Sequence, residues 1–265
     1  MPTFERDGAT IAYTDTGTPD APAIVFGHGL LFSGWMFHPQ IAALRERYRC
    51  VTIDWRGQGA SPASRGGYDM DSLTADAVAL IRRLGVGPVH WVGLSMGGFV
   101  GLRLAARHPE LVCSLVLLDT SAAGEEPAKT RRNKLLARMQ QLVGIKAVLG
   151  RVKPLLFGPA FLADPAARPT VDEWVRQVSG VGRGGLRQAV LGVSERAPVA
   201  AELPAITAPT LVVVGADDVA TPPAESEYLA AHIPGAELHL VPGCGHTSSL
   251  EQPAVITGLL EKFLV

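Results

Sequence analysis

The fold of this chain is best indicated by residues 89–98, which read VHWVGLSMGG. The first half is an apolar run that predicts a strand, and helical spacing follows from Ser95 to His108. Between them lies a Gly-x-Ser-x-Gly pattern, in which Gly93 and Gly97 leave room for a serine on a tight strand-to-helix turn. The start of the helix would direct unpaired N–H groups toward this serine. The pattern therefore predicts that Ser95 is a nucleophile.

The same alternation of strand and helix extends over most of the chain. Apolar runs predict strands at residues 11–13, 23–26, 50–53, 89–93, 112–119, 210–215 and 237–241. Helical spacing is clearest at residues 71–84, 95–108 and 250–264. This order predicts an α/β fold, with a mostly parallel central sheet covered by helices on both faces. The first strands are expected to form an antiparallel edge.

The alternation breaks between residues 123 and 204. This segment has no clear strand, carries a cluster of basic residues near its start, and contains helix-like patches at 135–143, 171–178 and 186–194. We predict that residues 123–204 form an inserted helical cap. The core would then consist of residues 1–122 and 205–265.

Composition excludes several classes of protein. The chain has 265 residues, 24 of them basic and 25 acidic, so no basic excess favours a nucleic-acid partner. Apolar runs such as residues 111–118 are too short to span a bilayer, and the first residues lack the apolar segment of a signal peptide. The three cysteines form no CxxC pair; Cys50 and Cys113 lie in apolar runs and are expected to be buried and reduced. We expect a soluble cytoplasmic protein without a membrane or nucleic-acid partner.

A serine hydroxyl is a weak nucleophile until a base removes its proton. Among seven histidines, His246 stands out because it lies in a glycine-rich loop after the 237–241 strand, just before the last helix. Loops at strand ends are where such a sheet presents its chemistry. His28 is expected instead to support its own loop through hydrogen bonds.

The base requires a carboxylate that orients it. Two aspartates, Asp217 and Asp218, follow the 210–215 strand, and only one of two adjacent side chains can face the histidine. We favour Asp218. Asp217 remains an alternative, and so does Asp119 at the end of the 112–119 strand.

An acyl-transfer site also needs donors for an oxyanion. The backbone N–H of Leu30, in the loop after the 23–26 strand, is the first candidate, with Leu31 as its alternative. The N–H of Met96 at the start of the helix is the second candidate.

With these motifs, the chain resembles the α/β-hydrolase family over nearly its whole length. The motifs that carry the resemblance are His28-Gly29, residues 54–61 (DWRGQGAS), residues 93–98, residues 215–218 (GADD) and Gly245-His246. The resemblance places the acid three residues after the glycine that ends its strand, which supports Asp218. Gln58 stands where histidine is usual, at a position that is structural in the family. Ser95 argues against family members with an aspartate nucleophile, such as haloalkane dehalogenases and epoxide hydrolases.

A narrower resemblance concerns residues 215–223 and 245–253, which look like the corresponding segments of 3-oxoadipate enol-lactonases. Similar strings occur in carboxylesterases, cofactor-free haloperoxidase/perhydrolases and carbon–carbon bond hydrolases. We expect a serine hydrolase of carboxylic esters, with small lactones as a further class, acting on a small molecule without a cofactor or metal. The alternatives are a perhydrolase, a carbon–carbon bond hydrolase, and a ligand receptor built on the hydrolase fold. The oligomeric state is not predicted.

Overall fold

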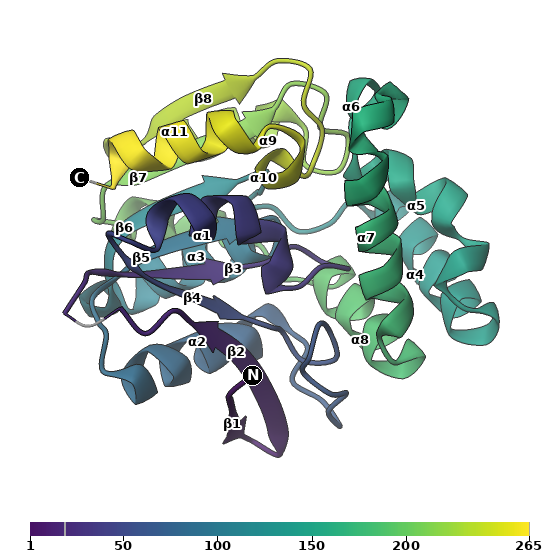
Figure 1. Ribbon diagram of the computed structural model, residues 1–265, viewed down its shortest axis with the longest axis horizontal. Coiled ribbons are helices and arrows are strands. Elements are labelled where there is room, and N and C mark those ends of the chain that lie inside the picture. The colour runs from purple at the N-terminus through teal and green to yellow at the C-terminus, as the bar shows by residue number, and fades with distance from the viewer. Residues whose placement is uncertain (19, 265) are drawn as a thin grey trace.

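The computed structural model describes residues 1–18 and 20–264, which contain one eight-stranded sheet with helices on both faces (Figure 1). The strands lie in the order β1-β2-β4-β3-β5-β6-β7-β8. Their bounds are β1 Thr3–Arg6, β2 Ala9–Asp15, β3 Ala23–Gly27, β4 Arg49–Ile53, β5 Val89–Leu94, β6 Val112–Leu118, β7 Thr210–Gly215 and β8 Glu237–Val241. The strands β1 and β2 are antiparallel to each other, and β2 is antiparallel to β4, whereas the remaining pairs are parallel. The predicted α/β fold with an antiparallel edge is confirmed.

Each central strand is buried on both faces, which explains its continuous apolar sequence. In β3, Ala23 and Val25 join the hydrophobic cluster on one face, and Ile24 and Phe26 join the cluster on the other. Successive side chains of a strand point to opposite faces, so a strand with helices on both sides must be apolar at every position.

Two groups of helices outside the cap supply these clusters. On one face lie α2, α3 and α9, and on the other α1, α10 and α11 (Figure 1). The bounds are α1 His38–Leu44, α2 Met70–Leu84, α3 Met96–Arg107, α9 Pro223–His232, α10 Ser248–Glu251 and α11 Pro253–Phe263. The prediction of one continuous helix over residues 250–264 is wrong, because the helix is interrupted at Gln252 (φ −131°, ψ 57°). The proline that follows disfavours helical backbone at this residue.

Between β6 and β7 the chain forms the helices α4 to α8, which lie beyond one end of the sheet (Figure 1). Their bounds are α4 Pro127–Val143, α5 Leu149–Leu156, α6 Pro159–Ala163, α7 Arg168–Gly180 and α8 Arg183–Ser194. Trp174 of α7 is fully buried, and its indole Nε1–H donates a hydrogen bond to the carbonyl of Leu31 at 3.1 Å. This contact packs α7 against the loop that follows β3.

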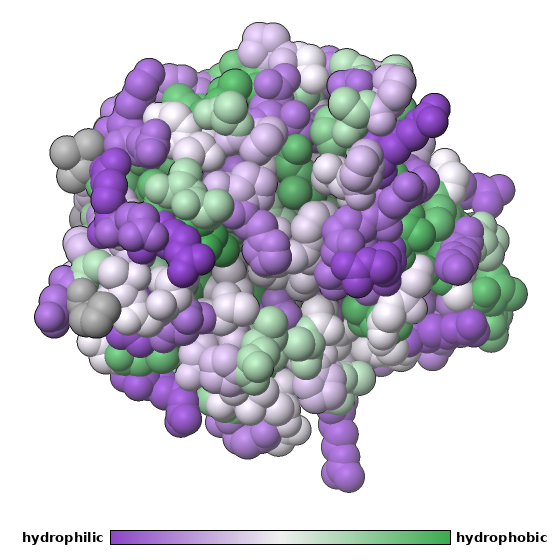
Figure 2. Space-filling model, in the orientation of Figure 1, coloured by the Kyte–Doolittle hydropathy of each residue, from purple (hydrophilic) through white to green (hydrophobic). Residues whose placement is uncertain are grey.

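The surface of the cap mixes charged and apolar side chains. Figure 2 shows hydrophobic side chains beside hydrophilic ones over the cap at the right of the molecule, and α4 carries Leu135, Leu142 and Val143, each at least 60% exposed. Within residues 1–18 and 20–264, no helix has both the length and the apolar character needed to cross a membrane.

Cys113 departs from the expectation of burial. Cys50 and Cys244 are buried, but Cys113 is exposed. The register between β5 and β6 shifts here, because Val112 pairs with Val89 and Ser114 pairs with His90. Cys113 is thus the extra residue of a bulge, and a bulged residue has no partner across the sheet.

Candidate active site

Ser95 occupies a strained turn between β5 and α3. Its backbone angles, φ 50° and ψ −108°, lie in a region that residues other than glycine rarely adopt. A side chain at Gly93 would place its Cβ 2.2 Å from the carbonyl oxygen of Gly97. A side chain at Gly97 would come within 1.9 Å of the carbonyl oxygen of Gly27 in β3. The glycines are therefore required by backbone contacts, as their spacing predicted.

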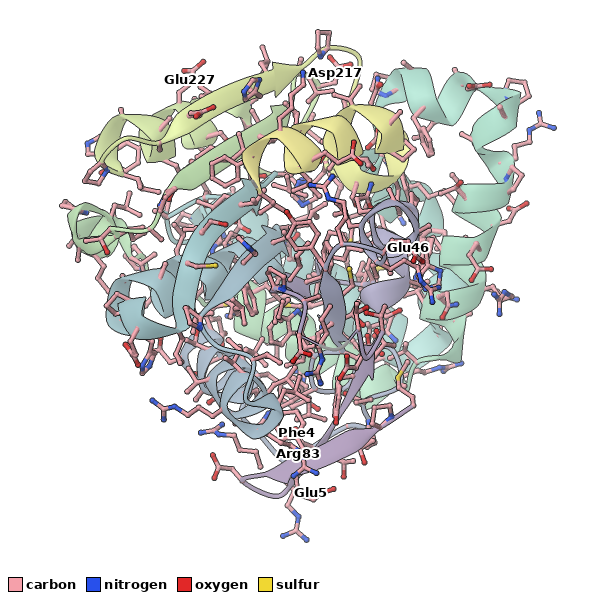
Figure 3. All side chains as sticks on the ribbon, turned by 60° about the vertical axis from the view of Figure 1, so that its left-hand side comes forward. Phe4, Glu5, Glu46, Arg83, Asp217 and Glu227 are labelled. Atoms are coloured by element: carbon pink, nitrogen blue, oxygen red, sulfur yellow. The ribbon has the colours of Figure 1, made fainter. Side chains whose placement is uncertain are left out.

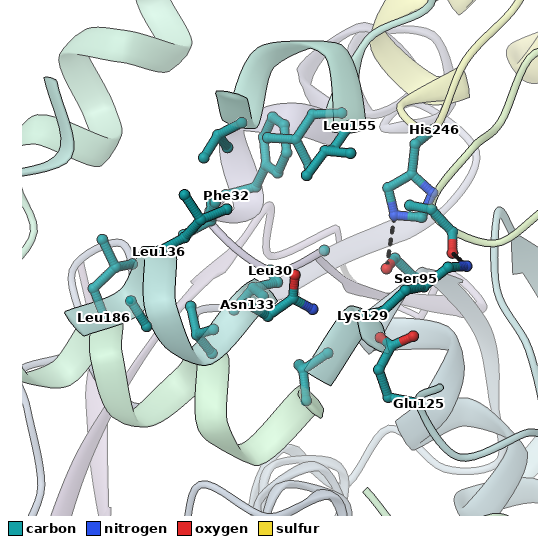
Figure 4. A pocket seen from close by; sticks show the side chains of 18 of the residues that line it. Leu30, Phe32, Ser95, Glu125, Lys129, Asn133, Leu136, Leu155, Leu186 and His246 are labelled. Carbon is teal, nitrogen blue, oxygen red and sulfur yellow. Dashed lines mark hydrogen bonds between the residues drawn. The ribbon is translucent and has the colours of Figure 1, made fainter. Parts of the chain in front are cut away.

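The structure brings Ser95, His246 and Asp218 together at one edge of the sheet. His246 Nε2 lies 2.9 Å from Ser95 Oγ (Figure 4). His246 Nδ1 lies 2.8 Å from Asp218 Oδ2. The three side chains follow β5, β8 and β7, whose carboxyl ends meet at this edge. With Nδ1–H donating to Asp218, Nε2 is free to accept the proton of the Ser95 hydroxyl.

Neither of the two alternative acids forms a hydrogen bond with His246. Asp217 is exposed at the surface (Figure 3). Asp119 is fully buried, but its carboxyl group accepts hydrogen bonds from the backbone N–H groups of Gly215 at 2.9 Å and Ser248 at 3.1 Å. Asp119 thus ties together the loops that carry Asp218 and His246, without a hydrogen bond to the imidazole itself.

Burial and neighbouring charge shift the pKa values at this site. Burial by itself lowers the pKa of His246, but the charge and hydrogen bond of Asp218, together with the charge of Asp119, raise it above its ordinary value of 6.5. Burial, reinforced by the negative charge of Asp218, raises the pKa of Asp119 to about 7. The imidazolium form of His246 is therefore stabilised inside the protein, as a base that must hold a proton in mid-reaction requires.

Two backbone amides next to the site have no protein acceptor. Within residues 1–18 and 20–264, neither the N–H of Leu30 nor that of Met96 donates a hydrogen bond to the protein. The N–H of Leu31, the alternative donor, is already engaged with Gln58 Oε1 at 2.8 Å. Of the three candidate donors, the amides of Leu30 and Met96 are therefore the unpaired ones.

His28 holds the loop that carries Leu30. Its Nε2 accepts a hydrogen bond from the N–H of Trp55 at 3.1 Å, and its Nδ1 lies 2.7 Å from the carbonyl of Gly29. Burial lowers the pKa of His28, which favours the neutral ring that this pattern needs. The hydrogen bonds match the supporting role expected for His28.

Sequence reasoning missed two side chains that hold the loops of the site. Thr221 Oγ1 donates to Asp218 Oδ2 at 2.9 Å, so the carboxylate is positioned from two sides. Glu251 accepts from the N–H groups of Gly245 at 2.8 Å and Thr247 at 3.1 Å, on either side of His246. Thr221 lies within residues 215–223 and Glu251 within residues 245–253, the two segments that carry the narrower resemblance. That resemblance was the feature of the sequence that could have pointed to them.

Ser95 and His246 open into a pocket that residues of α4, α5 and α8 also line. Figure 4 shows Lys129 and Glu125 beside Ser95, with apolar side chains extending away from the serine toward Leu136 and Leu186. Glu125 is paired with Arg196 at 3.2 Å, and the Arg196 guanidinium stacks on Phe99 at 4.2 Å. Glu125 and Arg196 therefore compensate each other, Lys129 lies 3.9 Å from Glu126, and the greater part of the pocket lining is apolar.

No group of three or more histidine, cysteine, aspartate or glutamate side chains in the described part of the chain is placed to hold a metal ion. The residues at the site can supply a nucleophile, a base, an orienting acid and two oxyanion donors. These are the components of acyl transfer through a serine.

The chain belongs to the α/β-hydrolase family, because residues 22–253 match the family described as "alpha/beta hydrolase fold". It is a hydrolase of the α/β type.

The chain is similar to 3-oxoadipate enol-lactonase 2 of Acinetobacter baylyi, at 29% identity over 99% of this chain and 96% of the relative. It is 32% identical to BpoC of Mycobacterium tuberculosis, provisionally named a non-heme bromoperoxidase, over 96% of this chain and 97% of that protein. Among solved structures, the enol-lactonase from Burkholderia xenovorans LB400 superposes with a TM-score of 0.91 at 29% identity, covering 99% of both chains. These relatives confirm the resemblance drawn from the motifs.

Proposed function

We propose that this protein is a serine hydrolase that cleaves carboxylic esters, with small lactones as a further substrate class. The observation that carries the proposal is the hydrogen-bonded chain from Ser95 Oγ through His246 to Asp218, opening into a largely apolar pocket. The pocket favours an uncharged ester with an apolar chain, because burying a charge without a partner is unfavourable. Similarity to enol-lactonases supports the inclusion of lactones.

The reaction would begin with Ser95 Oγ attacking the ester carbonyl while its proton passes to His246 Nε2. The carbonyl oxygen becomes an oxyanion, which accepts hydrogen bonds from the N–H groups of Leu30 and Met96. Asp218 keeps the imidazole in the required tautomer and stabilises its positive charge.

Collapse of the tetrahedral intermediate would break the bond to the leaving oxygen, which takes the proton from His246 Nε2 and departs as an alcohol. Water then enters, gives a proton to the same nitrogen, and attacks the acyl-enzyme at its carbonyl carbon. The acid is released when Ser95 Oγ regains its proton. A lactone would follow the same steps, with the leaving alcohol still attached to the acyl group.

The test is the rate of hydrolysis of p-nitrophenyl acetate, butyrate and octanoate and of a small lactone by wild type and Ser95→Ala. We expect turnover by the wild type that is lost in the variant, together with fluorophosphonate labelling of the wild type alone. Retained labelling of Ser95→Ala would show that another residue is the nucleophile. Stoichiometric labelling without turnover would instead favour a carbon–carbon bond hydrolase or a ligand receptor. Halide- and peroxide-dependent oxidation with acetate present would favour a perhydrolase.

A further inference from the structure

One wall of the pocket is a single face of α4, which runs away from Ser95. Lys129, Asn133, Leu136 and Gln140 line the pocket at spacings of three and four residues, as expected for one side of a helix. Figure 4 shows Lys129 beside Ser95 and Leu136 far from it. At 1.5 Å per residue, Gln140 lies about 16 Å along the helix axis from Lys129. Gln140 therefore belongs to the end of the pocket remote from the serine.

The surroundings of Gln140 are apolar. Ile145, Val148 and Leu186 are buried and line the pocket together with it. Gln140 itself is only 4% exposed, so bulk water has little access to its side chain.

The Gln140 amide has no partner in the protein. Its Oε1 is buried without a hydrogen bond, and within residues 1–18 and 20–264 no protein group bonds to its Nε2 either. Buried polar side chains are nearly always hydrogen-bonded, because an unsatisfied one destabilises the fold. Oε1 is closed off even from the open pocket, whereas the Nε2 group of Gln140, which lines the pocket, is accessible and is therefore free to donate to a ligand group.

We propose that Gln140 recognises a neutral hydrogen-bonding group, a hydroxyl or a carbonyl oxygen, at the far end of the substrate's apolar chain. The inference rests on the proposed ester hydrolysis and narrows the class of substrate. The preferred substrate is an ester whose chain ends in such a group. The Nε2 group of a primary amide donates hydrogen bonds, so it can bind the oxygen of either group. A substrate that ends in a methyl group would leave the amide unpaired, and sites built to hydrogen-bond a substrate discriminate against such analogues.

The experiment compares the wild type with Gln140→Leu, which removes the amide and retains most of the volume. Gln141→Leu is the matched control, because Gln141 is the next residue of α4, is exposed, and does not line the pocket. One substrate series consists of p-nitrophenyl ω-hydroxyalkanoates of increasing length, each paired with the alkanoate in which a methyl group replaces the hydroxyl. A second series pairs monoacetates of α,ω-diols with alkyl acetates, and so tests whether the alcohol side of the ester enters the pocket.

In one of the two series we expect the wild type to favour the hydroxyl-bearing member by about tenfold in kcat/KM, the effect of one hydrogen bond to a buried amide. Gln140→Leu should abolish this preference, and Gln141→Leu should retain it. The melting temperature of Gln140→Leu should equal or exceed that of the wild type, because an unsatisfied polar group is removed.

A preference that is absent from both series, or one that survives in Gln140→Leu, would overturn the role of Gln140 while ester hydrolysis stands. A marked drop in the melting temperature of Gln140→Leu would also overturn it, by showing that the amide serves the fold. Absence of turnover with every ester, plain or substituted, would overturn the proposed function and this inference with it.

Discussion

Replacing Asp218 with asparagine should change which nitrogen of His246 carries the proton. Asp218 Oδ1 accepts from the N–H groups of Ala220 at 2.8 Å and Thr221 at 3.0 Å, whereas Oδ2 faces His246 Nδ1. The asparagine must keep its oxygen toward the two N–H groups, so its NH2 group takes the place of Oδ2. That NH2 donates to Nδ1, and the imidazole proton moves to Nε2. The Ser95 hydroxyl then meets an N–H donor where it needs a base.

The expected loss follows from this change of tautomer. Loss of the orienting carboxylate in a serine–histidine–aspartate site lowers kcat by about 10⁴. At 1.36 kcal/mol per factor of ten, this is ~5.4 kcal/mol of transition-state stabilisation. Steady-state kinetics on p-nitrophenyl butyrate measure the loss, and circular dichroism with a thermal melt shows that the variant is folded.

Asp217→Asn is the matched control, because it makes the same chemical change at the adjacent, exposed residue. We expect its kcat to stay within about twofold of the wild type, as for a surface substitution that breaks no buried contact. If Asp217→Asn is the damaging variant, or if folded Asp218→Asn retains a tenth of the wild-type kcat, the tautomer argument is refuted.

Three further results are expected. The value of kcat/KM should rise with pH through a midpoint above 6.5, because His246 acts as a base only when neutral and its pKa is raised; a midpoint below 6.5 would contradict this. Gly97→Ala should destabilise the protein by about 3 kcal/mol, because its Cβ would lie 1.9 Å from the Gly27 carbonyl oxygen. Its control is Gly258→Ala on α11, where the added Cβ meets open space and the melting temperature should be equal to or higher than that of the wild type. Asp119→Asn should cost about 1–3 kcal/mol in urea unfolding, because an amide oxygen and NH2 cannot accept from both backbone N–H groups; an unchanged midpoint would show that the carboxylate is not needed there.

The general position of the site was predictable from the sequence because its signals are local. The strand, turn and helix around Ser95 follow from the apolar run and from two glycines whose missing side chains are read directly from the chain. Strand ends are equally local, and in a parallel sheet they meet at one edge, so His246 and an aspartate after β7 were expected near Ser95.

The choice between neighbouring groups depended on contacts that form only once the loops are folded, some of them between segments far apart in the chain. Asp218 faces His246 because Thr221 and two backbone amides hold its carboxylate. Leu31 has no free N–H because Gln58, from another loop, accepts its hydrogen bond. Adjacent residues, such as Asp217 and Asp218 or Leu30 and Leu31, differ in the direction of their side chains or N–H groups. That direction is set by the folded backbone and cannot be predicted from composition or spacing.

The sequence by itself determined the class of the sheet, the glycine-flanked turn at Ser95 and the presence of a helical segment between two strands, since these depend on periodicity and on steric rules within a few residues. Only the tertiary structure decided what the pocket presents to a substrate. Helical spacing identified part of α4, but not that its Gln140 would be buried without a partner among apolar side chains. The physical reason is that burial and hydrogen-bond satisfaction are set by packing between elements, whereas periodicity reports only which residues share a face.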